Sequence, residues 1–158
     1  MQLRSAARAF RPGGFSLIEL MVVVAIATIL FAVAVPSYML YVRQSRRTEA
    51  RTAVLDLAGR EERFFSTNGA TYSVTPAQLG YAALPVVIGS GYYSLNVCSP
   101  ACAPSAVAAP SYTVTATPVA GQSQTRDRQC ASFSVDSTGR QFALDSTGAD
   151  ATQFCWSN

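Results

Sequence analysis

A long apolar segment near the N-terminus most constrains what this chain can fold into. It runs without a charge for 23 residues, from Leu20 to Val42, and a helix of that length is long enough to cross a hydrocarbon core of about 30 Å. An ordinary secretory signal has a shorter apolar region followed by a small-residue cleavage site, whereas here the small residue, Gly14, precedes the run. The segment therefore predicts a membrane-spanning helix. An acid, Glu19, lies directly before it, although burying a carboxylate in hydrocarbon is costly.

The residue types of the 158-residue chain do not favour an enzyme, and its charge is not that of a strongly basic protein. Its formal net charge is +3, and all twelve basic residues are Arg, three of which (Arg4, Arg8 and Arg11) lie among the first fourteen residues. Without that leader, nine basic residues face nine acidic ones. The chain has no His, and its sequence shows neither a metal-ligand cluster nor a phosphate-binding glycine loop. We therefore expect no enzyme activity, no cofactor and no bound metal.

The cysteines indicate on which side of a membrane the C-terminal part lies. Arginines flank both ends of the apolar run, so the positive-inside rule does not decide its orientation. All four cysteines follow the run: Cys98, Cys102, Cys130 and Cys155. An even number of cysteines after an export signal indicates disulfides in an oxidising compartment, and the alternative is reduced thiols in a cytosolic protein. We adopt the first interpretation, which places the C-terminal part outside the cytoplasm.

The stretch GGFSLIELMVVVAIATIL resembles the cleavage and methylation motif of type IV prepilins and of the related type II secretion pseudopilins. The resemblance implies that a membrane aspartyl peptidase removes residues 1–14 as a prepilin leader by cutting between Gly14 and Phe15. It also implies that the same enzyme N-methylates the new amino terminus on Phe15. Pro36 matches a proline that often kinks the helix in this family.

The resemblance gives Glu19 a role in assembly. Cleavage creates a positive amine on Phe15, four residues from Glu19 and on the same helical face. Within one subunit, or between neighbours in a fibre, that amine can neutralise the carboxylate, and a subunit out of register would leave both charges unpaired in apolar surroundings. The alternative is a Glu19 solvated by lipid headgroups. Pro36 removes one helical hydrogen bond, so we expect it to bend or locally open the helix after Leu30.

Beyond the apolar run the helix is expected to continue and to become amphipathic. We divide it into a transmembrane and assembly half, 15–42, and an amphipathic half, 43–68. The apolar residues of the second half recur at helical spacing: Ala50, Ala53, Val54, Leu57, Phe64 and Phe65. Charged residues occupy the other faces: Arg43, Arg46, Arg47, Glu49, Arg51 and Arg60. Asn68 and Gly69 suit a left-handed cap that ends the helix.

Residues 69–158 are expected to form a globular β-rich head. The segment 69–91 is dense in Gly and Pro and is interpreted as a loop, and 98–110 as a surface loop of low complexity. Alternating apolar and polar residues predict strands over 92–97, 111–117, 130–135 and 140–144. The sequence DSTG occurs twice, at 136–139 and 145–148, as expected of turns that begin with Asp and end with Gly. The prediction is an α+β fold, the type IV pilin fold, in which the long helix packs on a roughly four-stranded antiparallel sheet.

Three disulfide connectivities are possible for the four cysteines, and we favour Cys130–Cys155 with Cys98–Cys102. A Cys130–Cys155 bond closes a loop of about 25 residues and contributes roughly 3–4 kcal/mol by loop entropy. It would hold down the C-terminal region. Pairing of Cys98 with Cys130 is the alternative. The final CW and the segment TYSVTPAQLGY resemble PilE-like minor pilins, which are similar to ComP-type DNA-uptake receptors.

Two further groups of residues resemble binding sites but are also explained by ordinary loop chemistry. Arg126 and Arg128 form the best DNA-binding candidate, but Asp127 divides them and the chain has no Lys, so a solvated loop is the preferred interpretation. Carboxylates of the two DSTG turns and of the segment after them suggest a calcium loop like that of type II secretion pseudopilins. These are Asp136, Asp145 and Asp150. Turn formation is the better explanation for them.

The resemblance implies a structural subunit, a minor pilin, of a type IV pilus. It would be held in the bacterial inner membrane with its head in the periplasm, and would then enter the extracellular fibre. The implied partners are other pilin subunits, the prepilin peptidase and the pilus assembly platform; little in the sequence supports DNA as a further partner. The alternatives are a type II secretion pseudopilin, a ComP-like DNA-uptake receptor within the pilus, and a membrane-anchored binding module that never polymerises.

Overall fold

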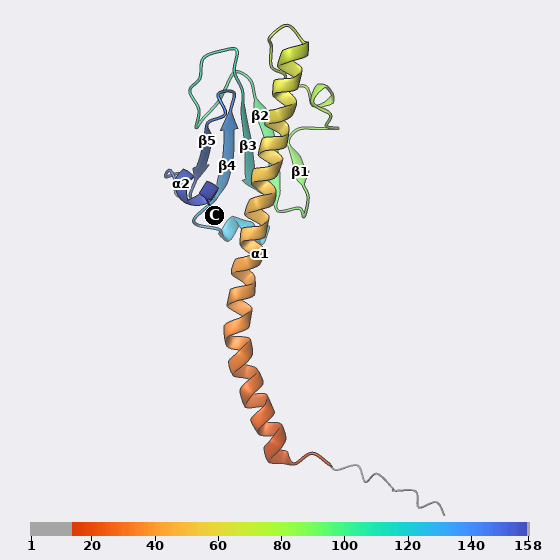
Figure 1. The fold of residues 1–158 in the computed structure, drawn as a ribbon, viewed down its shortest axis with the longest axis vertical. Helices are drawn as coiled ribbons and strands as arrows, with labels where there is room; N and C mark the ends of the chain where they lie inside the picture. The colour runs from red at the N-terminus through yellow and green to blue at the C-terminus, as the bar shows by residue number, and fades with distance from the viewer. Residues whose placement is uncertain (1–13, 158) are drawn as a thin grey trace, which may run out of the picture. The chain divides into compact units, whose positions relative to one another are not determined.

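A computed structural model describes residues 14–157, and the chain divides between Met39 and Leu40 into two compact units. We call residues up to Met39 the first unit and residues from Leu40 onward the second unit. One helix, α1 (Leu17–Thr67), contributes to both units and carries the colours from red to yellow in Figure 1. The leader 1–14 expected from the sequence lies outside the described residues, apart from Gly14.

In the first unit α1 is an uninterrupted α-helix. It contains an 18-residue window of mean hydropathy 2.8, none of which is buried. Two of its hydroxyl side chains donate to main-chain carbonyls on the preceding turn, Thr28 to Ala25 O at 2.8 Å and Ser37 to Val33 O at 3.1 Å. The helix continues through Pro36 without the local opening that was one of the two effects expected there; the other, a bend, stays a prediction. Apart from the hydrogen bond that Pro36 cannot donate, the backbone of such a helix is bonded internally, which is the main requirement for residence in lipid.

The end of α1 in the second unit agrees with the expected left-handed cap. The last helical residue is Thr67, and Gly69 and Ala70 both have positive φ, 69° and 59°. The Ala70 N–H donates to Phe65 O at 3.2 Å and the Asn68 N–H to Phe64 O at 2.9 Å, so two of the carbonyls in the last turn of the helix are satisfied.

The sheet of the second unit has five antiparallel strands, one more than expected. They are β1 (Val86–Ile88), β2 (Tyr93–Cys98), β3 (Thr113–Pro118), β4 (Ser132–Asp136) and β5 (Gln141–Leu144), paired in chain order. The interpretation of 69–91 as a loop is wrong in two places, because it contains β1 and a short 3-10 helix, η1 (Pro76–Leu79). A second 3-10 helix, η2 (Ser123–Arg126), and a C-terminal α2 (Thr152–Ser157) complete the unit.

Strand register gathers the apolar side chains on the sheet face toward α1. Leu95 pairs with Ala116, and Phe133 pairs with both Ala116 and Ala143. These residues form one core with the buried face of α1, whose apolar members are Ala50, Val54, Leu57 and Ala58. In Figure 1 this part of α1 lies across the sheet, and α2 lies beside β5. The predicted α+β arrangement of a long helix on an antiparallel sheet is confirmed.

Two disulfides are present, and they join the pairs that we favoured from the sequence. Cys130–Cys155 links the segment before β4 to α2, and both cysteines are buried. Trp156 adds a hydrogen bond from Nε1 to Phe142 O at 2.9 Å, so α2 is fixed against β5. The other disulfide, Cys98–Cys102, lies at the end of β2, where Cys102 is exposed.

Candidate functional site

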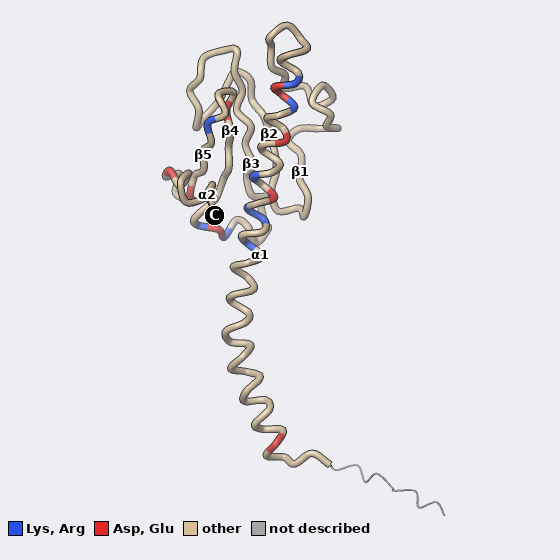
Figure 2. The backbone as a smooth tube through the Cα atoms, viewed as in Figure 1, with Lys and Arg blue, Asp and Glu red and all other residues tan. Residues whose placement is uncertain are grey.

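The residues expected to direct processing and assembly lie just before α1, at Gly14 and Phe15, and in its first turn, at Glu19. Gly14 has open space around it, since a Cβ added there would meet nothing within 4 Å. Phe15 is 80% exposed, and helical hydrogen bonding begins with the Leu20 N–H donating to Ser16 O at 3.2 Å. Glu19 falls in the first turn of α1, where the partial positive charge of the helix terminus favours an acid. Figure 2 shows that the helix beyond this acidic position carries no further charge until the second unit.

The first unit exposes apolar side chains all around α1. Large side chains that stay at least half exposed include Leu17, Ile18, Leu20, Met21, Ile29, Leu30, Phe31 and Val33. Monomeric soluble proteins rarely leave so large a continuous apolar surface in water. The surface therefore requires lipid or neighbouring helices around it.

In the second unit, a bidentate ion pair joins α1 to the segment before β4. Arg47 Nε donates to Asp127 Oδ2 at 2.6 Å, and Arg47 Nη2 donates to Asp127 Oδ1 at 2.7 Å. The exposed fractions of the two side chains are 9% and 1%. The sequence separated Arg47 from the apolar face of the helix, and the structure shows that its side chain is nevertheless buried, with its charge satisfied by the bidentate bond to Asp127.

Further donors complete the shell around the Asp127 carboxylate. Gln124 Nε2 donates to Asp127 Oδ2 at 3.1 Å and also to the Tyr93 hydroxyl at 3.1 Å. The main-chain N–H groups of Gln129 and Cys130 donate to Oδ1 at 3.2 and 3.3 Å. This network ties the segment 122–130 to both α1 and β2. Sequence reasoning missed it, since its members are far apart in the chain.

The network changes the interpretation of the two arginines proposed for DNA binding. Arg126 and Arg128 are both exposed, at either side of the inward-facing Asp127. We expected Asp127 to weaken their positive field, but its charge is matched by Arg47 inside the protein. Among the ion pairs of residues 14–157, neither Arg126 nor Arg128 takes part. The segment therefore presents two uncompensated cations at the surface.

The carboxylates considered for calcium act within their own turns. Asp136 Oδ1 accepts hydrogen bonds from the Thr138 N–H and hydroxyl at 2.9 and 2.6 Å, and its Oδ2 accepts one from Ser105 at 2.8 Å. Asp145 likewise accepts from the N–H and hydroxyl of Thr147, which lowers its pKa below the ordinary value. Asp150 has the same relation to Thr152. Within residues 14–157, no three His, Cys, Asp or Glu side chains gather in a way that could hold a metal ion.

Comparisons with known proteins agree with the two parts of the structure. Residues 10–35 match the prokaryotic N-terminal methylation motif, and residues 36–134 match the family described as type IV minor pilin ComP, DNA uptake sequence receptor. The type IV major pilin protein PilA of Myxococcus xanthus (strain DK1622) is 40% identical over 72 residues, which are 46% of this chain and 32% of that protein. The fimbrial protein EcpC of Eikenella corrodens is 36% identical over 88 residues, 56% of this chain and 55% of EcpC.

These aligned segments span about a third and about half of the length of the two curated relatives. The ComP family match, by contrast, covers more than half of this chain and extends from Pro36 through η2 and most of β4. The helix-on-sheet fold, the apolar start of α1 and the methylation motif before it all agree with that assignment. The chain therefore belongs to the type IV minor pilin ComP family.

Proposed function

We propose that this protein is a minor subunit of a type IV pilus and has no catalytic role. The observation that carries the proposal is the apolar surface of the first unit, which has an acid in the first turn of the helix and no buried residue in its most apolar window. In the membrane that surface contacts lipid; in a fibre it contacts the same segment of neighbouring subunits. Assembly thus exchanges lipid contacts for helix packing. The second unit then forms the outer part of the fibre.

Processing supplies the charge that Glu19 needs. Cleavage between Gly14 and Phe15, followed by N-methylation, leaves a cationic amine at the start of the helix. A carboxylate in apolar surroundings is stable only when it is paired, so the amine of Phe15 and the acid of Glu19 align subunits as they enter the fibre. The prepilin peptidase, the assembly platform and other pilin subunits are the partners that this sequence of events requires. The inner membrane, with the second unit in the periplasm, is where it begins.

Mass spectrometry of the protein from sheared surface fibres tests the proposal. We expect a mature chain that begins with N-methylated Phe15. Replacing Gly14 by Val should leave the full-length chain in the membrane fraction, because the peptidase has no room for the side chain. Nothing in the protein itself opposes that side chain, since the space around Gly14 is open. An unprocessed chain in wild-type cells with active peptidase would contradict the proposal.

A type II secretion pseudopilin would share this processing and differ in where the fibre ends. Recovery of the protein from sheared fibres on the cell surface supports the pilus, whereas its restriction to the periplasm supports the pseudopilus. A membrane-anchored module that never polymerises would give no fibre-associated protein at all. The ComP family match favours the pilus.

DNA uptake is a second candidate function, and the family match is the observation that favours it. Arg126 and Arg128 supply an exposed cationic pair within the matched region. If the pair contacts phosphates, the double variant R126Q/R128Q should weaken binding of a short DNA duplex and lower the slope of log K against log salt by about 2. Arg63→Gln, which removes an exposed arginine elsewhere, should leave that binding unchanged. Equal binding by the wild type and the double variant would remove these two residues from any DNA site.

A further inference from the structure

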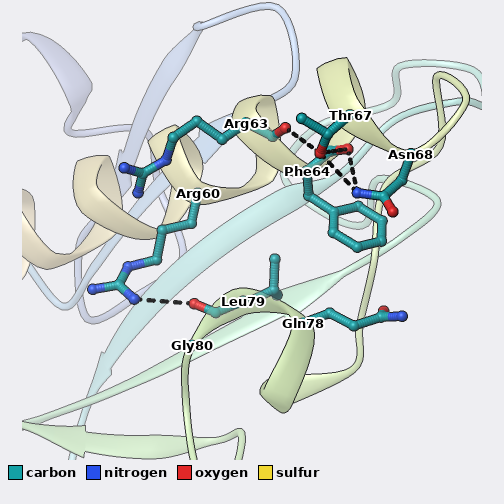
Figure 3. Close-up of a pocket in the computed structure, with 8 residues that line it drawn as sticks. All are labelled: Arg60, Arg63, Phe64, Thr67, Asn68, Gln78, Leu79 and Gly80. Carbon is teal, nitrogen blue, oxygen red and sulfur yellow. Dashed lines mark hydrogen bonds between the residues drawn. The ribbon is translucent and has the colours of Figure 1, made fainter.

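An open pocket of about 480 Å³ lies in the second unit where α1 ends and η1 passes beside it. Its lining contains two arginines and no acidic residue. Figure 3 shows the guanidinium groups of Arg60 and Arg63 at one side of this pocket, and the Phe64 ring with the Asn68 and Gln78 amides at the other. None of these residues belongs to the processing motif or to the segment 122–130. The pocket is therefore a separate feature that the assembly function leaves unused.

The Arg60 side chain is held in place before any ligand arrives. Its Nε donates to Asp56 Oδ2 at 2.8 Å, its Nη1 donates to Leu79 O at 3.1 Å, and its guanidinium lies 4.9 Å from the centre of the Tyr81 ring. The turn after η1 depends on Gly80, which has a φ of 75° and where a Cβ would come within 2.7 Å of Arg60 Nη1. A guanidinium fixed in this way loses little conformational entropy on binding a ligand.

The charges at the pocket suit a ligand with a single negative charge. Arg60 is paired with Asp56, whereas Arg63, one helical turn further along the same face, forms no ion pair among the described residues. The neighbouring Glu62 accepts a hydrogen bond from the Tyr72 hydroxyl at 3.3 Å and does not line the pocket. The two arginines of the lining, together with the one acid paired with them, Asp56, thus leave about one uncompensated positive charge. A DNA backbone needs a more extended cationic surface than this.

The other side of the pocket offers contacts for an uncharged, hydroxylated body. Gln78 uses its Oε1 to accept from Ser73, which leaves its NH₂ group for a ligand. Asn68 uses its NH₂ group within the helix cap, which leaves its Oδ1 as an acceptor. Between these amides the Phe64 ring can pack against the C–H face of a sugar ring. An apolar platform with a few directed polar groups is the usual composition of a small-ligand site.

From this arrangement we propose that the pocket binds an acidic sugar, with its carboxylate at Arg60 and Arg63 and its ring on Phe64. The ligand class is a uronic acid residue within a surface or extracellular polysaccharide. Within the second unit, the pocket lies at the opposite end of the helical segment from Leu40. Binding would therefore leave the segment used for assembly free. The inference goes beyond the proposed pilus function and does not depend on it, because it concerns the isolated subunit.

Calorimetric titration of the full chain in detergent micelles tests the proposal. The probe is a tetrasaccharide of alternating glucuronate and N-acetylglucosamine, and its carboxyl methyl ester is the matched neutral ligand. We expect saturable binding of the acid and at least tenfold weaker binding of the ester. Arg63→Gln should weaken binding of the acid at least tenfold and leave folding unchanged, because Arg63 is exposed. R126Q/R128Q is the matched control and should bind the sugar like the wild type.

Several outcomes would overturn the proposal. No saturable binding of the tetrasaccharide, equal binding of its methyl ester, or unchanged binding by Arg63→Gln would each do so. A further such outcome is that a glutamate-rich peptide or a DNA duplex binds more tightly than the tetrasaccharide and loses that binding in Arg63→Gln. Either result would assign the pocket to a different class of ligand. Gly80→Ala, which displaces Arg60 without removing a charge, should also weaken binding of the acid. Failure of the chain to enter fibres, with sugar binding intact, would contradict only the pilus function.

Discussion

Arg47 and Asp127 form a buried ion pair with two hydrogen bonds, of 2.6 and 2.7 Å, although 80 residues separate them in the chain. One lies on α1 and the other just after η2, so the pair fixes the segment 122–130 to the helix. Five donor groups, counting both from Arg47, converge on the Asp127 carboxylate. Such a pair is costly to break from one side, because the remaining charge stays in the interior without a partner.

Asp127→Ala should therefore destabilise the second unit by about 3–5 kcal/mol. Asp56→Ala is the matched control: it breaks the exposed Arg60–Asp56 pair and should cost less than about 1 kcal/mol. Urea unfolding of the detergent-solubilised chain, followed by near-ultraviolet circular dichroism, measures both. Similar losses for the two variants would show that burial adds nothing to the Arg47–Asp127 pair.

Glu61 should make stability fall as the pH rises through neutrality. Its side chain is fully buried; its Oε2 accepts the Ser73 N–H at 3.1 Å, and its Oε1 has no hydrogen-bond partner within residues 14–157. Burial raises its pKa from 4.5 to about 7, the Ser73 hydrogen bond opposes that shift, and the nearby Glu62 adds to it. Because the folded-state pKa lies above the unfolded value, protonation stabilises the fold fully below about pH 4.5, and this contribution is lost as the pH rises through about 7.

Glu61→Gln keeps the shape of the side chain and removes its titration. Relative to the wild type, the variant should gain on the order of 2–3 kcal/mol between pH 4.5 and pH 8. The acids with lowered pKa, Asp136, Asp145 and Asp150, titrate below this window and do not interfere. Unfolding free energies of both proteins at four pH values provide the measurement. A difference between them that stays constant with pH would show that Glu61 has the same pKa in the folded and the unfolded protein, and would contradict the raised pKa.

The two disulfides should differ in importance. The cysteines of the Cys130–Cys155 bond are 25 residues apart in the sequence, and both are buried. The variant C130S/C155S should therefore lose about 3.5 kcal/mol of stability and release α2. Cys98–Cys102 spans a separation of only 4, and C98S/C102S should lose about 2 kcal/mol. Thr113 Oγ1 still donates to Cys102 O at 3.0 Å, which helps hold that loop in place.

Graded reduction followed by alkylation and peptide mapping checks the same difference without mutation. Cys102 is exposed, so the Cys98–Cys102 bond should be reduced first, while the buried Cys130–Cys155 bond persists until the second unit unfolds. Simultaneous reduction of both bonds in the folded protein would contradict this order.

The sequence alone was enough to predict the elements that a local residue pattern determines. The apolar run and the helical spacing of Ala50, Val54 and Leu57 predicted α1 and its buried face, and Gly69 predicted its end. Alternating residues predicted four of the strands to within about two residues. The three-residue strand β1 was missed because it lies in a segment rich in Gly and Pro. It forms only through pairing with β2, such as Val86 with Leu95, which no local pattern records.

The polar interior could not be predicted for a related reason. Charged residues on an amphipathic helix usually face water, so no sequence pattern indicated that Arg47 and Glu61 are buried. Their burial depends on partners that the fold brings together, Asp127 for the arginine and the Ser73 N–H for the acid. The same long-range pairing turned Asp127 away from Arg126 and Arg128, which reversed our argument about their charge.

Replacement of Glu19 by Gln tests the central claim, that the acid at the start of α1 aligns subunits in a fibre. The change makes the first unit more apolar, so the amount of protein in the membrane fraction should stay the same or rise. Loss of one partner from a desolvated pair costs about 3–5 kcal/mol, which is on the order of a thousandfold in occupancy. The measurement is the ratio of sheared-fibre protein to membrane protein for the wild type and the Gln variant, side by side. We predict near-complete loss of the variant from fibres with normal membrane levels, and incorporation equal to that of the wild type would contradict the account.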